Sequence, residues 1–480
     1  MKKIIHEYIN TICSIYPNLG TVFGLSYLGY NNFSLEGKKH NIDKLESLKL
    51  KIKEHEDEYE KNIMTTMLDK SIYELKSIYS FTAYYYYSMT IQSFLILFRN
   101  YKYYTCGIDK EVLISRVNQF PEVINKFKTE VNGNSFSYID LLYTLSLIKK
   151  DLYFIKYELI KILSKTDYEI ILSETQSILE FISKKIKRSS KTNLFIDLGK
   201  EDFINYIDLM SEYNVDSIML EKLYKAAIHY VDKNSQCNIF NYQNDIDKKK
   251  INIFSIKELL YSVFSESNYI FGDVNDMFEN LNIIDLNNSN FYFGEFQYLP
   301  SYMNDTKNGA CILFSSNNIK SSKLLKLKII HEIYPGHHFS YSKQRSNLLN
   351  KITKNMFLEE GWAKYCEFLF AFEIDNSYEM KQAYKIKHLL SSINFIITMN
   401  IHYYDRKLSE IFDLLMNKCG LDKHRILSLI MQCNVQPLSS INYFVGFHVV
   451  KSILANKKTD NNMYEFLVET FYDKESTVII

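Results

Sequence analysis

Apolar residues recur every three or four positions through most of the first 235 residues of this chain. A clear example lies in residues 138–163, where apolar positions include Ile139, Leu142, Leu145, Leu147 and Ile148. This spacing places apolar side chains on one face of an α-helix. The chain also has only 5 prolines and 14 glycines in 480 residues, so few residues break helices. The pattern therefore predicts a mainly α protein.

Two polar stretches, at 232–250 and 285–309, interrupt this pattern and are typical of loops. A short apolar run at 310–314 follows and predicts a strand, and helices are predicted from Ser322 and from about Lys354. We therefore expect a helical N-terminal region at 1–235, a loop-rich connecting region at 236–309 and a metal-binding catalytic region at 310–480. The whole is expected to be one continuous cleft-forming unit.

One segment has the length of a membrane span. Ser77 to Phe98 carries no charged residue over 22 positions. It also contains seven serine, threonine and glutamine residues, whose side chains would have to lie in hydrocarbon. The pattern favours a buried helix of a soluble protein, with a span as the alternative, and we expect no stable membrane insertion.

Composition narrows the class of protein. The 57 basic residues nearly balance the 56 acidic ones, so no global field would attract nucleic acid. The 7 cysteines form no CxxC pair, which argues against a disulfide framework and for a reducing compartment. His6, Glu7 and Asn10 interrupt the apolar run that a signal peptide needs. These features predict a cytoplasmic protein, and none indicates its oligomeric state.

Candidate chemistry lies in the sequence His-Glu-Ile-Tyr-Pro-Gly-His-His, which begins at His331. In the zincin motif HExxH, two histidines one helical turn apart hold zinc, and the glutamate between them acts as the base. The pair His331 and Glu332 resembles the first half of that motif. The expected second histidine is missing, because the fourth residue after His331 is Pro335.

The next imidazoles are those of His337 and His338. If Pro335 and Gly336 form a bulge in the helix, His337 returns to the face of His331 and takes the second ligand position. A straight helix would instead bring His338 to that face, since seven residues complete about two turns. Its backbone would then lie about 10 Å from that of His331, so we favour His337 and keep His338 as the alternative.

A carboxylate is available for the third ligand position of a zinc site. Glu360 follows His331 by 29 residues, an interval typical of gluzincins, and lies on a predicted helix. Glu367 shares the helical face of Glu360 and is expected to orient a ligand histidine. Trp362, the only tryptophan, is expected to pack beneath the metal. One zinc ion per chain is predicted.

The two motifs together resemble a known family. His-Glu-Ile-Tyr-Pro-Gly-His-His followed by Glu-Gly-Trp-Ala-Lys-Tyr-Cys-Glu is similar to the signatures HExxPGHH and EGWAxYxE of the bacterial domain of unknown function 885. The resemblance extends over at least residues 285–455. It implies a gluzincin-like helical metallopeptidase with a deep central cleft and a small β element beside the metal helix.

The same resemblance assigns further residues. Tyr443 and Gly446 match a C-terminal Tyr-x-x-Gly element, which implies that the Tyr443 phenol stabilises the oxyanion. His402 matches a family histidine and is expected to assist Tyr443 or to bind substrate. Family members usually carry an arginine and an aspartate before that histidine, whereas this chain has asparagine and threonine there. Recognition of a charged substrate group is therefore in doubt.

The resulting hypothesis is a zinc-dependent peptidase in which Glu332 is the general base. The substrate is expected to be a peptide or a small amide, and a bound peptide is expected to pair with the free edge of the strand at 310–314. Two alternatives stay open, a metal-dependent amidohydrolase acting on a small non-peptide substrate and a binding pseudoenzyme without turnover. His338 is expected to contact substrate if His337 is the ligand.

Overall fold

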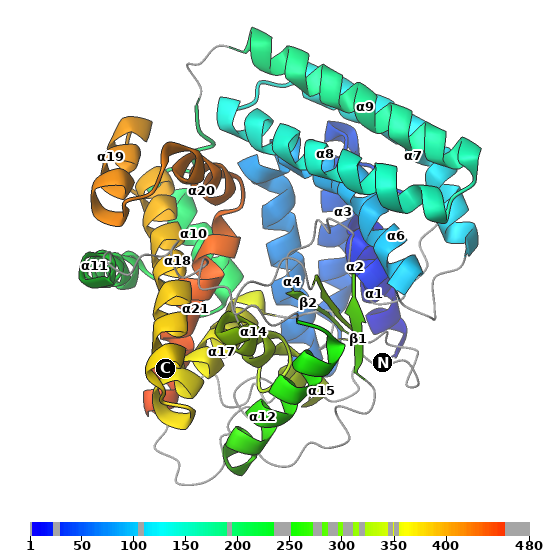
Figure 1. Ribbon diagram of the computed structural model, residues 1–480. Helices are drawn as coiled ribbons and strands as arrows, with labels where there is room; N and C mark the ends of the chain where they lie inside the picture. Colours follow the sequence, from blue (N-terminus) through cyan, green and yellow to red (C-terminus); the bar gives the residue numbers. More distant parts are fainter. Residues whose placement is uncertain are drawn as a thin grey trace.

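The chain folds into a mainly helical structure with a small three-stranded sheet (Figure 1). The computed structural model describes residues 2–22, 29–103, 110–189, 194–234, 251–271, 281–286, 296–300, 311–315, 322–343, 349 and 355–456. Statements about structure below refer to these residues. The predicted mainly α class is confirmed.

The N-terminal half contains α-helices and short helical turns. They are α1 (Lys2–Ile15), α2 (Pro17–Val22), α3 (Leu35–Ile52), α4 (Glu58–Lys76), η1 (Ile78–Phe81), α5 (Ala83–Tyr87), η2 (Ser88–Gln92), α6 (Ser93–Tyr103), α7 (Lys110–Gly133), α8 (Tyr138–Glu158), η3 (Leu159–Lys161), α9 (Lys165–Arg188), α10 (Lys200–Ser211) and α11 (Ser217–Asn234).

The C-terminal half adds the sheet and the remaining helices. They are α12 (Ile253–Phe271), β1 (Asn282–Asp285), β2 (Phe296–Leu299), β3 (Cys311–Phe314), α14 (Ser322–Glu332), α15 (His337–Lys343), α17 (Met356–Leu369), η5 (Phe370–Ile374), α18 (Tyr378–His402), α19 (Leu408–Cys419), α20 (Lys423–Val435) and α21 (Pro437–Asn456). The region at 236–309, predicted to be rich in loops, thus also contains a helix and two strands.

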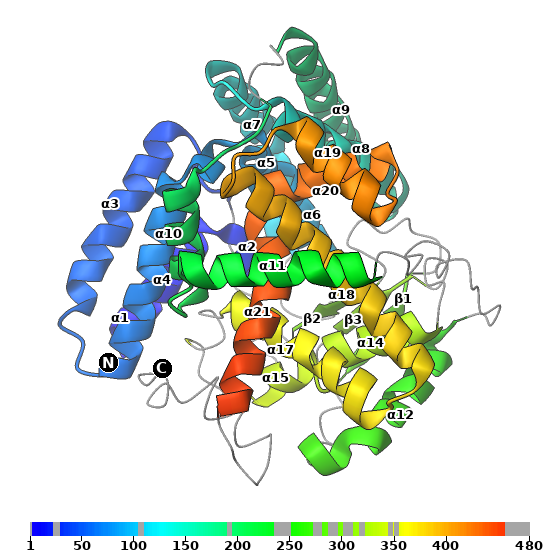
Figure 2. The same ribbon diagram turned by 90° about the vertical axis from the view of Figure 1, so that its left-hand side faces the viewer.

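Buried apolar side chains form three clusters. One joins α1, α3 and α4, which lie together at the left of Figure 2. A second cluster lies among the helices from α5 to α9. Of these, α7, α8 and α9 form the upper layer in Figure 1. The third and largest joins α10 to α12 with the helices from α14 to α21. Helices α18 and α21 contact each other within this last cluster, where α21 also packs against α17.

The uncharged segment Ser77–Phe98 is broken into η1, α5, η2 and the first part of α6. Thr82 interrupts it in an extended conformation, and its hydroxyl accepts a hydrogen bond from the Tyr85 amide. Tyr86, Phe94 and Phe98 are buried in the second cluster. One described helix, Pro437–Ala455 in α21, is long and apolar enough to cross a membrane, and half of it is buried inside the protein.

The sheet has the strand order β1-β3-β2, with β1 parallel and β2 antiparallel to β3. Successive β3 side chains point to opposite faces. Ile312 and Phe314 join the largest cluster, whereas Cys311 and Leu313 join the second cluster. The predicted strand at 310–314 is therefore present but central. The expectation that a peptide pairs with its free edge is wrong, because β1 and β2 occupy both edges.

Helices α17 and α21 cross with their backbones in contact at two glycines. A Cβ atom added to Gly361 would lie 2.4 Å from the carbonyl oxygen of Gly446. A Cβ atom added to Gly446 would lie 2.4 Å from the carbonyl oxygen of Phe357. No side chain larger than hydrogen fits at this crossing unless the helices move apart. The crossing places Glu360, next to Gly361, beside Tyr443, one turn before Gly446.

We predict that Gly446→Ala lowers the free energy of unfolding by about 3 kcal/mol, the upper end for overpacked sites, because the neighbouring atoms are backbone. Gly133→Ala is the matched control. A Cβ atom at Gly133 meets nothing within 4 Å, so alanine there should be neutral or stabilise the protein by up to about 1 kcal/mol. Urea unfolding of both variants measures the contrast, and equal stabilities would contradict the close crossing.

Candidate metal centre

The helix that carries His331 ends directly after the His-Glu pair. The amides of Ile333 and Tyr334 both donate to the carbonyl oxygen of Ile329, at 2.8 and 3.2 Å, and α14 ends at Glu332. The chain then turns and starts a new helix, α15, at His337. The predicted bulge inside a continuous helix is thus wrong in form, because α14 stops and α15 begins.

The turn nevertheless returns His337 to His331. A Cβ atom added to Gly336 would lie 1.8 Å from the carbonyl oxygen of His331, so the chain packs directly against the end of α14 at this glycine. The two imidazole rings have centroids 4.8 Å apart and planes at 88°. Glycine is required at this position because any side chain would push α15, and with it His337, away from α14.

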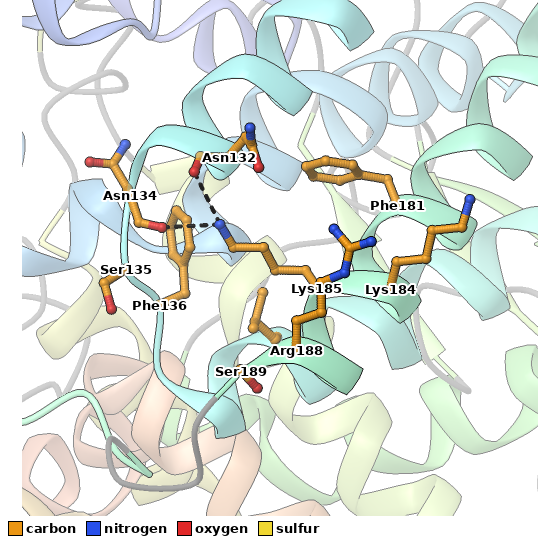
Figure 3. Close-up of a pocket in the computed structure, with 10 residues that line it drawn as sticks. Asn132, Asn134, Ser135, Phe136, Phe181, Lys184, Lys185, Arg188 and Ser189 are labelled. Carbon is orange, nitrogen blue, oxygen red and sulfur yellow. Dashed lines mark hydrogen bonds between the residues drawn. The ribbon is translucent and has the colours of Figure 1, made fainter.

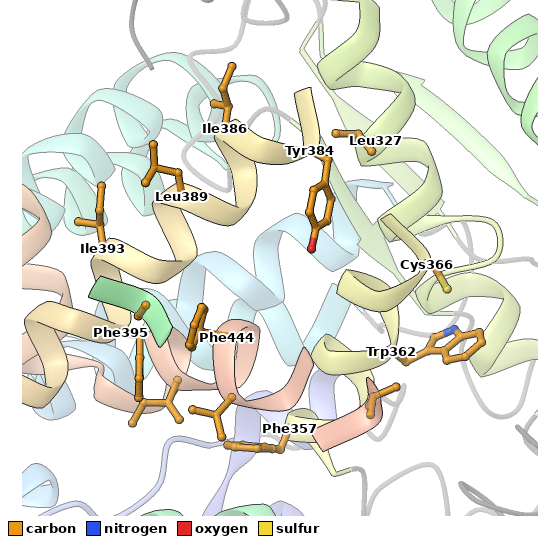
Figure 4. Close-up of a cluster of buried hydrophobic side chains, with 14 of the residues drawn as sticks. Leu327, Phe357, Trp362, Cys366, Tyr384, Ile386, Leu389, Ile393, Phe395 and Phe444 are labelled. Carbon is orange, nitrogen blue, oxygen red and sulfur yellow. The ribbon is translucent and has the colours of Figure 1, made fainter. Parts of the chain in front are cut away.

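Trp362 holds this turn in place. Its indole nitrogen Nε1 donates to the carbonyl oxygen of Pro335 at 2.8 Å, and the Cys366 thiol lies 3.7 Å from the same oxygen. Both side chains are fully buried and lie on the same side of α17 in Figure 4. Trp362 was predicted to pack beneath the metal, and its observed role is to tie α17 to the turn before His337.

Three potential ligand atoms converge on one point from three helices. His331 on α14, His337 on α15 and Glu360 on α17 each offer one atom, and these atoms all lie within 4.8 Å of one another. Oε2 of Glu360 lies 3.2 Å from Nε2 of His331 and 3.6 Å from Nε2 of His337. The structure therefore brings together the three residues predicted as ligands.

This group has the dimensions and chemistry of a metal site. Zinc–ligand distances of 2.0–2.1 Å and tetrahedral angles place neighbouring ligand atoms about 3.3 Å apart, close to the separations here. Oε2 of Glu360 is buried and has no hydrogen-bond partner, although it faces both imidazoles. Two imidazoles and one carboxylate are also a common catalytic zinc set, which leaves a fourth position for water. The residues fit a divalent cation.

Charges in the group are strongly coupled. Burial alone would lower the pKa of His337, but the Glu360 carboxylate beside it raises that pKa to about 9. Burial would raise the pKa of Glu360, yet His337 and His331 hold it well below its usual range. A proton on an imidazole thus stabilises the buried Glu360 carboxylate in the way that a metal cation would. The proton and the metal cation therefore compete for the same imidazole nitrogens.

Two further side chains border the group. The Tyr443 ring stacks on the His331 ring with centroids 6.0 Å apart. The charge of Glu360 and burial raise the pKa of Tyr443 well above its usual value, so its hydroxyl stays protonated and able to donate. Glu332, at the end of α14, is partly exposed. Its charge also raises the pKa of both Tyr443 and His337, which places it near the ligands.

His338 has a different environment from His337. Its Nδ1 lies 3.2 Å from the hydroxyl of Tyr298 on β2, and the two rings pack together. It does not belong to the ligand group in the described part of the chain. Of the two histidines left open by the sequence, the structure brings His337 to the group.

Glu367 contacts the far side of the His331 ring, as expected from the sequence. Its Oε1 lies 2.9 Å from Nδ1 of His331 and accepts a hydrogen bond from Lys387 at 2.7 Å. Its Oε2 accepts from Lys364 at 2.7 Å. The sequence interpretation missed both lysines. The contact of Lys364 could have been predicted from the sequence, because this residue lies one helical turn from both Glu360 and Glu367. The contact of Lys387 could not, because this residue comes from another helix and no local pattern relates it to Glu367.

His402 does not join the ligand group. His402 lies at the end of α18, and Lys387 on the same helix contacts Glu367. The 15 residues between Lys387 and His402 correspond to about 22 Å along α18, so His402 lies far from Glu367. The His402 ring packs against Phe203 and the Tyr79 ring instead, and burial lowers its pKa to about 3. The predicted catalytic role beside Tyr443 is therefore corrected to a buried, neutral histidine of the core.

The segment before His402, where Asn394 and Thr398 stand in place of the usual family arginine and aspartate, contacts itself and the core. The Thr398 hydroxyl donates to the carbonyl oxygen of Asn394 at 2.9 Å. The Asn400 side chain donates to the carbonyl oxygen of Ile396 and accepts from the Tyr224 hydroxyl. Thr398 and Asn400 are fully buried. These substitutions thus maintain the core of α18 and place no charge near the ligand group.

A pocket of about 470 Å³ lies elsewhere, at the ends of α7 and α9 (Figure 3). Lys184, Lys185 and Arg188 line it, and none of its lining residues belongs to the ligand group. The Lys185 ammonium already donates to three backbone carbonyls, those of residues 131, 132 and 134. The pocket therefore contributes nothing to the candidate chemistry.

Two solved structures share the fold of this chain. One is a "putative lipoprotein of unknown function from Shewanella oneidensis", with a TM-score of 0.68, and the other is a "putative lipoprotein from Colwellia psychrerythraea", with a TM-score of 0.70. Each is 12% identical in sequence, and the alignments cover 98% of this chain and 97% and 96% of the two structures. No curated protein matches the chain significantly.

These neighbours contradict the predicted cytoplasmic location, because both are described as lipoproteins, a class that is held at a membrane by a lipid anchor. The prediction relied partly on unpaired cysteines. The five cysteines in the described part of the chain are buried and free, so they are explained as small packed side chains and do not report the redox compartment. The cytoplasmic location is not retained.

The family comparison bears on the half of the chain that holds the ligand group. The matched residues include both signature motifs, the three ligand candidates and Tyr443. The resemblance predicted from those motifs is confirmed: residues 302–466 match the model of the family described as "Bacterial protein of unknown function (DUF885)".

Proposed function

We propose that this protein is a zinc-dependent peptidase that holds one ion per chain between His331, His337 and Glu360. One observation carries the proposal: three ligand atoms within 4.8 Å of one another are supplied by three separate helices, with a carboxylate and a phenol beside them. A structural ion pair would need only one histidine and one carboxylate. Two imidazoles directed at the same buried carboxylate oxygen are better explained by a cation.

The proposal includes a gluzincin-like arrangement, in which the site opens to solvent through a cleft. The exposed fraction of the His337 side chain is 14% and Glu332 is partly exposed, whereas the His331 side chain is only 7% exposed. This gradient supports access from the side of Glu332. Substrate would approach there, while Glu367 closes the opposite side of the group.

Bound zinc would supply Lewis acidity, polarising a substrate carbonyl and lowering the pKa of a water molecule. Glu332 would accept a proton from the water that attacks the amide carbonyl and would deliver it to the departing amine nitrogen. The protonated Tyr443 hydroxyl would donate a hydrogen bond to the carbonyl oxygen as its negative charge develops. The Tyr443 role matches the protonated state that burial and the charge of Glu360 favour.

A peptide substrate would find its partner strand in β2 rather than β3. Within the described residues, β2 pairs on one side only, and its Tyr298 reaches His338 next to the ligand His337. A second candidate, hydrolysis of a small non-peptide amide, is favoured by Asn394 and Thr398, which stand where family members usually carry an arginine and an aspartate. These positions offer no charge to a peptide terminus. The presence of Glu332 argues against a pseudoenzyme.

We predict that Glu332→Gln retains zinc but loses at least about 100-fold in turnover, because the amide keeps the shape of the side chain and cannot accept a proton. Zinc content by atomic emission and cleavage of a mixed peptide library by mass spectrometry give the two readouts. Loss of zinc from this variant would identify Glu332 as a ligand and reject its assignment as the base.

The third ligand can be tested against its neighbour in the sequence. Glu360→Ala should lose most of its bound zinc, whereas Glu359→Ala should retain a wild-type amount, because only the Glu360 oxygen faces both imidazoles. The two changes remove the same side chain from adjacent positions of α17, so general damage to the helix would affect both. Zinc loss at position 359 alone would reject the ligand set.

The two adjacent histidines allow a similar contrast. His337→Ala should lose zinc, and His338→Ala should keep it while changing KM, because His338 contacts Tyr298 rather than the ligand group. Zinc content under identical purification, followed by steady-state kinetics, measures both effects. If His337→Ala retained zinc and His338→Ala lost it, the second ligand would be His338, seven residues after His331.

A further inference from the structure

The carboxylate behind His331 carries an unusual number of cationic partners. Glu367 is fully buried, and its two oxygens contact Nδ1 of His331 and the ammonium groups of Lys364 and Lys387, each at 2.7–2.9 Å. The Lys364 side chain is 3% exposed and that of Lys387 is 22% exposed. Two positive charges thus face one negative charge directly behind a proposed metal ligand.

The two positive charges around Glu367 oppose the effect that a carboxylate usually has on a ligand histidine. A carboxylate that accepts a hydrogen bond from a ligand histidine raises the basicity of that imidazole and so strengthens its bond to a metal. Each ammonium group draws electron density away from the shared oxygens and adds its own repulsion toward a cation. In a buried site these charges are weakly screened, so their effect extends across the His331 ring.

We propose that Lys387, together with Lys364, weakens the affinity of the His331 site for its divalent cation by offsetting the charge of Glu367. The inference rests on the proposed metal site and adds a determinant of its affinity. The same two lysines stabilise the metal-free protein, because an ionised Glu367 without them would be a buried charge with only one imidazole as partner. Both ammonium groups contact Glu367, and through it they act on His331.

Lys387 is the residue to test, because its partial exposure lets a shorter or neutral side chain fit. Lys387→Met removes both the charge and the hydrogen bond to Glu367, Lys387→Gln removes the charge but keeps a donor, and Lys387→Arg keeps both. Lys385→Met is the matched control. It loses one lysine from the same helix, two residues away and about 200° around its axis.

The experiment is a zinc titration of the full chain against a chelator of known affinity, with thermal unfolding of the metal-free proteins as a second readout. We expect Lys387→Met and Lys387→Gln to bind zinc about 10-fold more tightly than wild type, a change of the size, though of the opposite sign, that loss of a carboxylate behind a ligand histidine causes. Lys387→Arg and Lys385→Met should bind as wild type does. Metal-free Lys387→Met should unfold at a lower temperature than metal-free Lys385→Met.

Other outcomes reject the inference in distinct ways. Weaker zinc binding by Lys387→Gln would mean that the lysine only holds Glu367 and His331 in position. Unchanged affinity in both neutral variants would mean that its charge does not reach the site. Failure of the wild-type protein to bind zinc would reject the proposed metal site itself, and the inference with it. Should Lys387→Met fail to fold, the comparison of Lys387→Gln with Lys387→Arg decides the question.

Discussion

The close crossing of α17 and α21 is the constraint on which the candidate site depends. The helices touch backbone to backbone at Gly361 and Gly446, with no room for a Cβ atom on either side. Because Glu360 precedes one of these glycines and Tyr443 lies one turn before the other, the crossing fixes the ligand carboxylate beside the phenol. It also explains in steric terms why each of two separate sequence motifs contains a glycine, one residue after Glu360 and three residues after Tyr443.

A second requirement is that positively charged partners balance the charges of the two buried carboxylates on α17. Glu360 and Glu367 are both buried, and burial of an unpaired charge is strongly unfavourable. Glu360 is compensated by two imidazoles and Glu367 by two lysines and one imidazole. His331 contacts both carboxylates, one through each ring nitrogen. These two contacts fix the orientation of the His331 ring before any cation binds.

Described residues of the N-terminal half support the beginning of the ligand helix α17. Asn355 caps α17 through its side-chain oxygen and donates through its amide nitrogen to the carbonyl oxygen of Ser211, at the end of α10. Lys70 on α4 pairs with Glu212 at the same helix end. The N-terminal helices thus contact the beginning of the ligand helix. The alignments with the two structural neighbours cover 98% of this chain, so the shared fold includes its N-terminal half.

The sequence alone determined the helical class, the motif residues and their order. Periodic apolar positions are a local property of each segment, and a set such as His331, Glu332 and Glu360 is recognisable from residue types and spacing. The sequence also favoured an irregularity at Pro335 and Gly336, because neither residue supports a regular helix, but it left a straight helix with His338 as ligand open.

Only the tertiary structure decided which of these residues meet. The return of His337 depends on Trp362 holding the Pro335 carbonyl, a contact between residues 27 positions apart. Lys387 reaches Glu367 from another helix, and His402, on the same helix as Lys387, is carried into the core by about four helical turns. The central position of β3 likewise depends on pairing with strands from separate segments. Contacts of this kind are set by packing between elements, which no local pattern records.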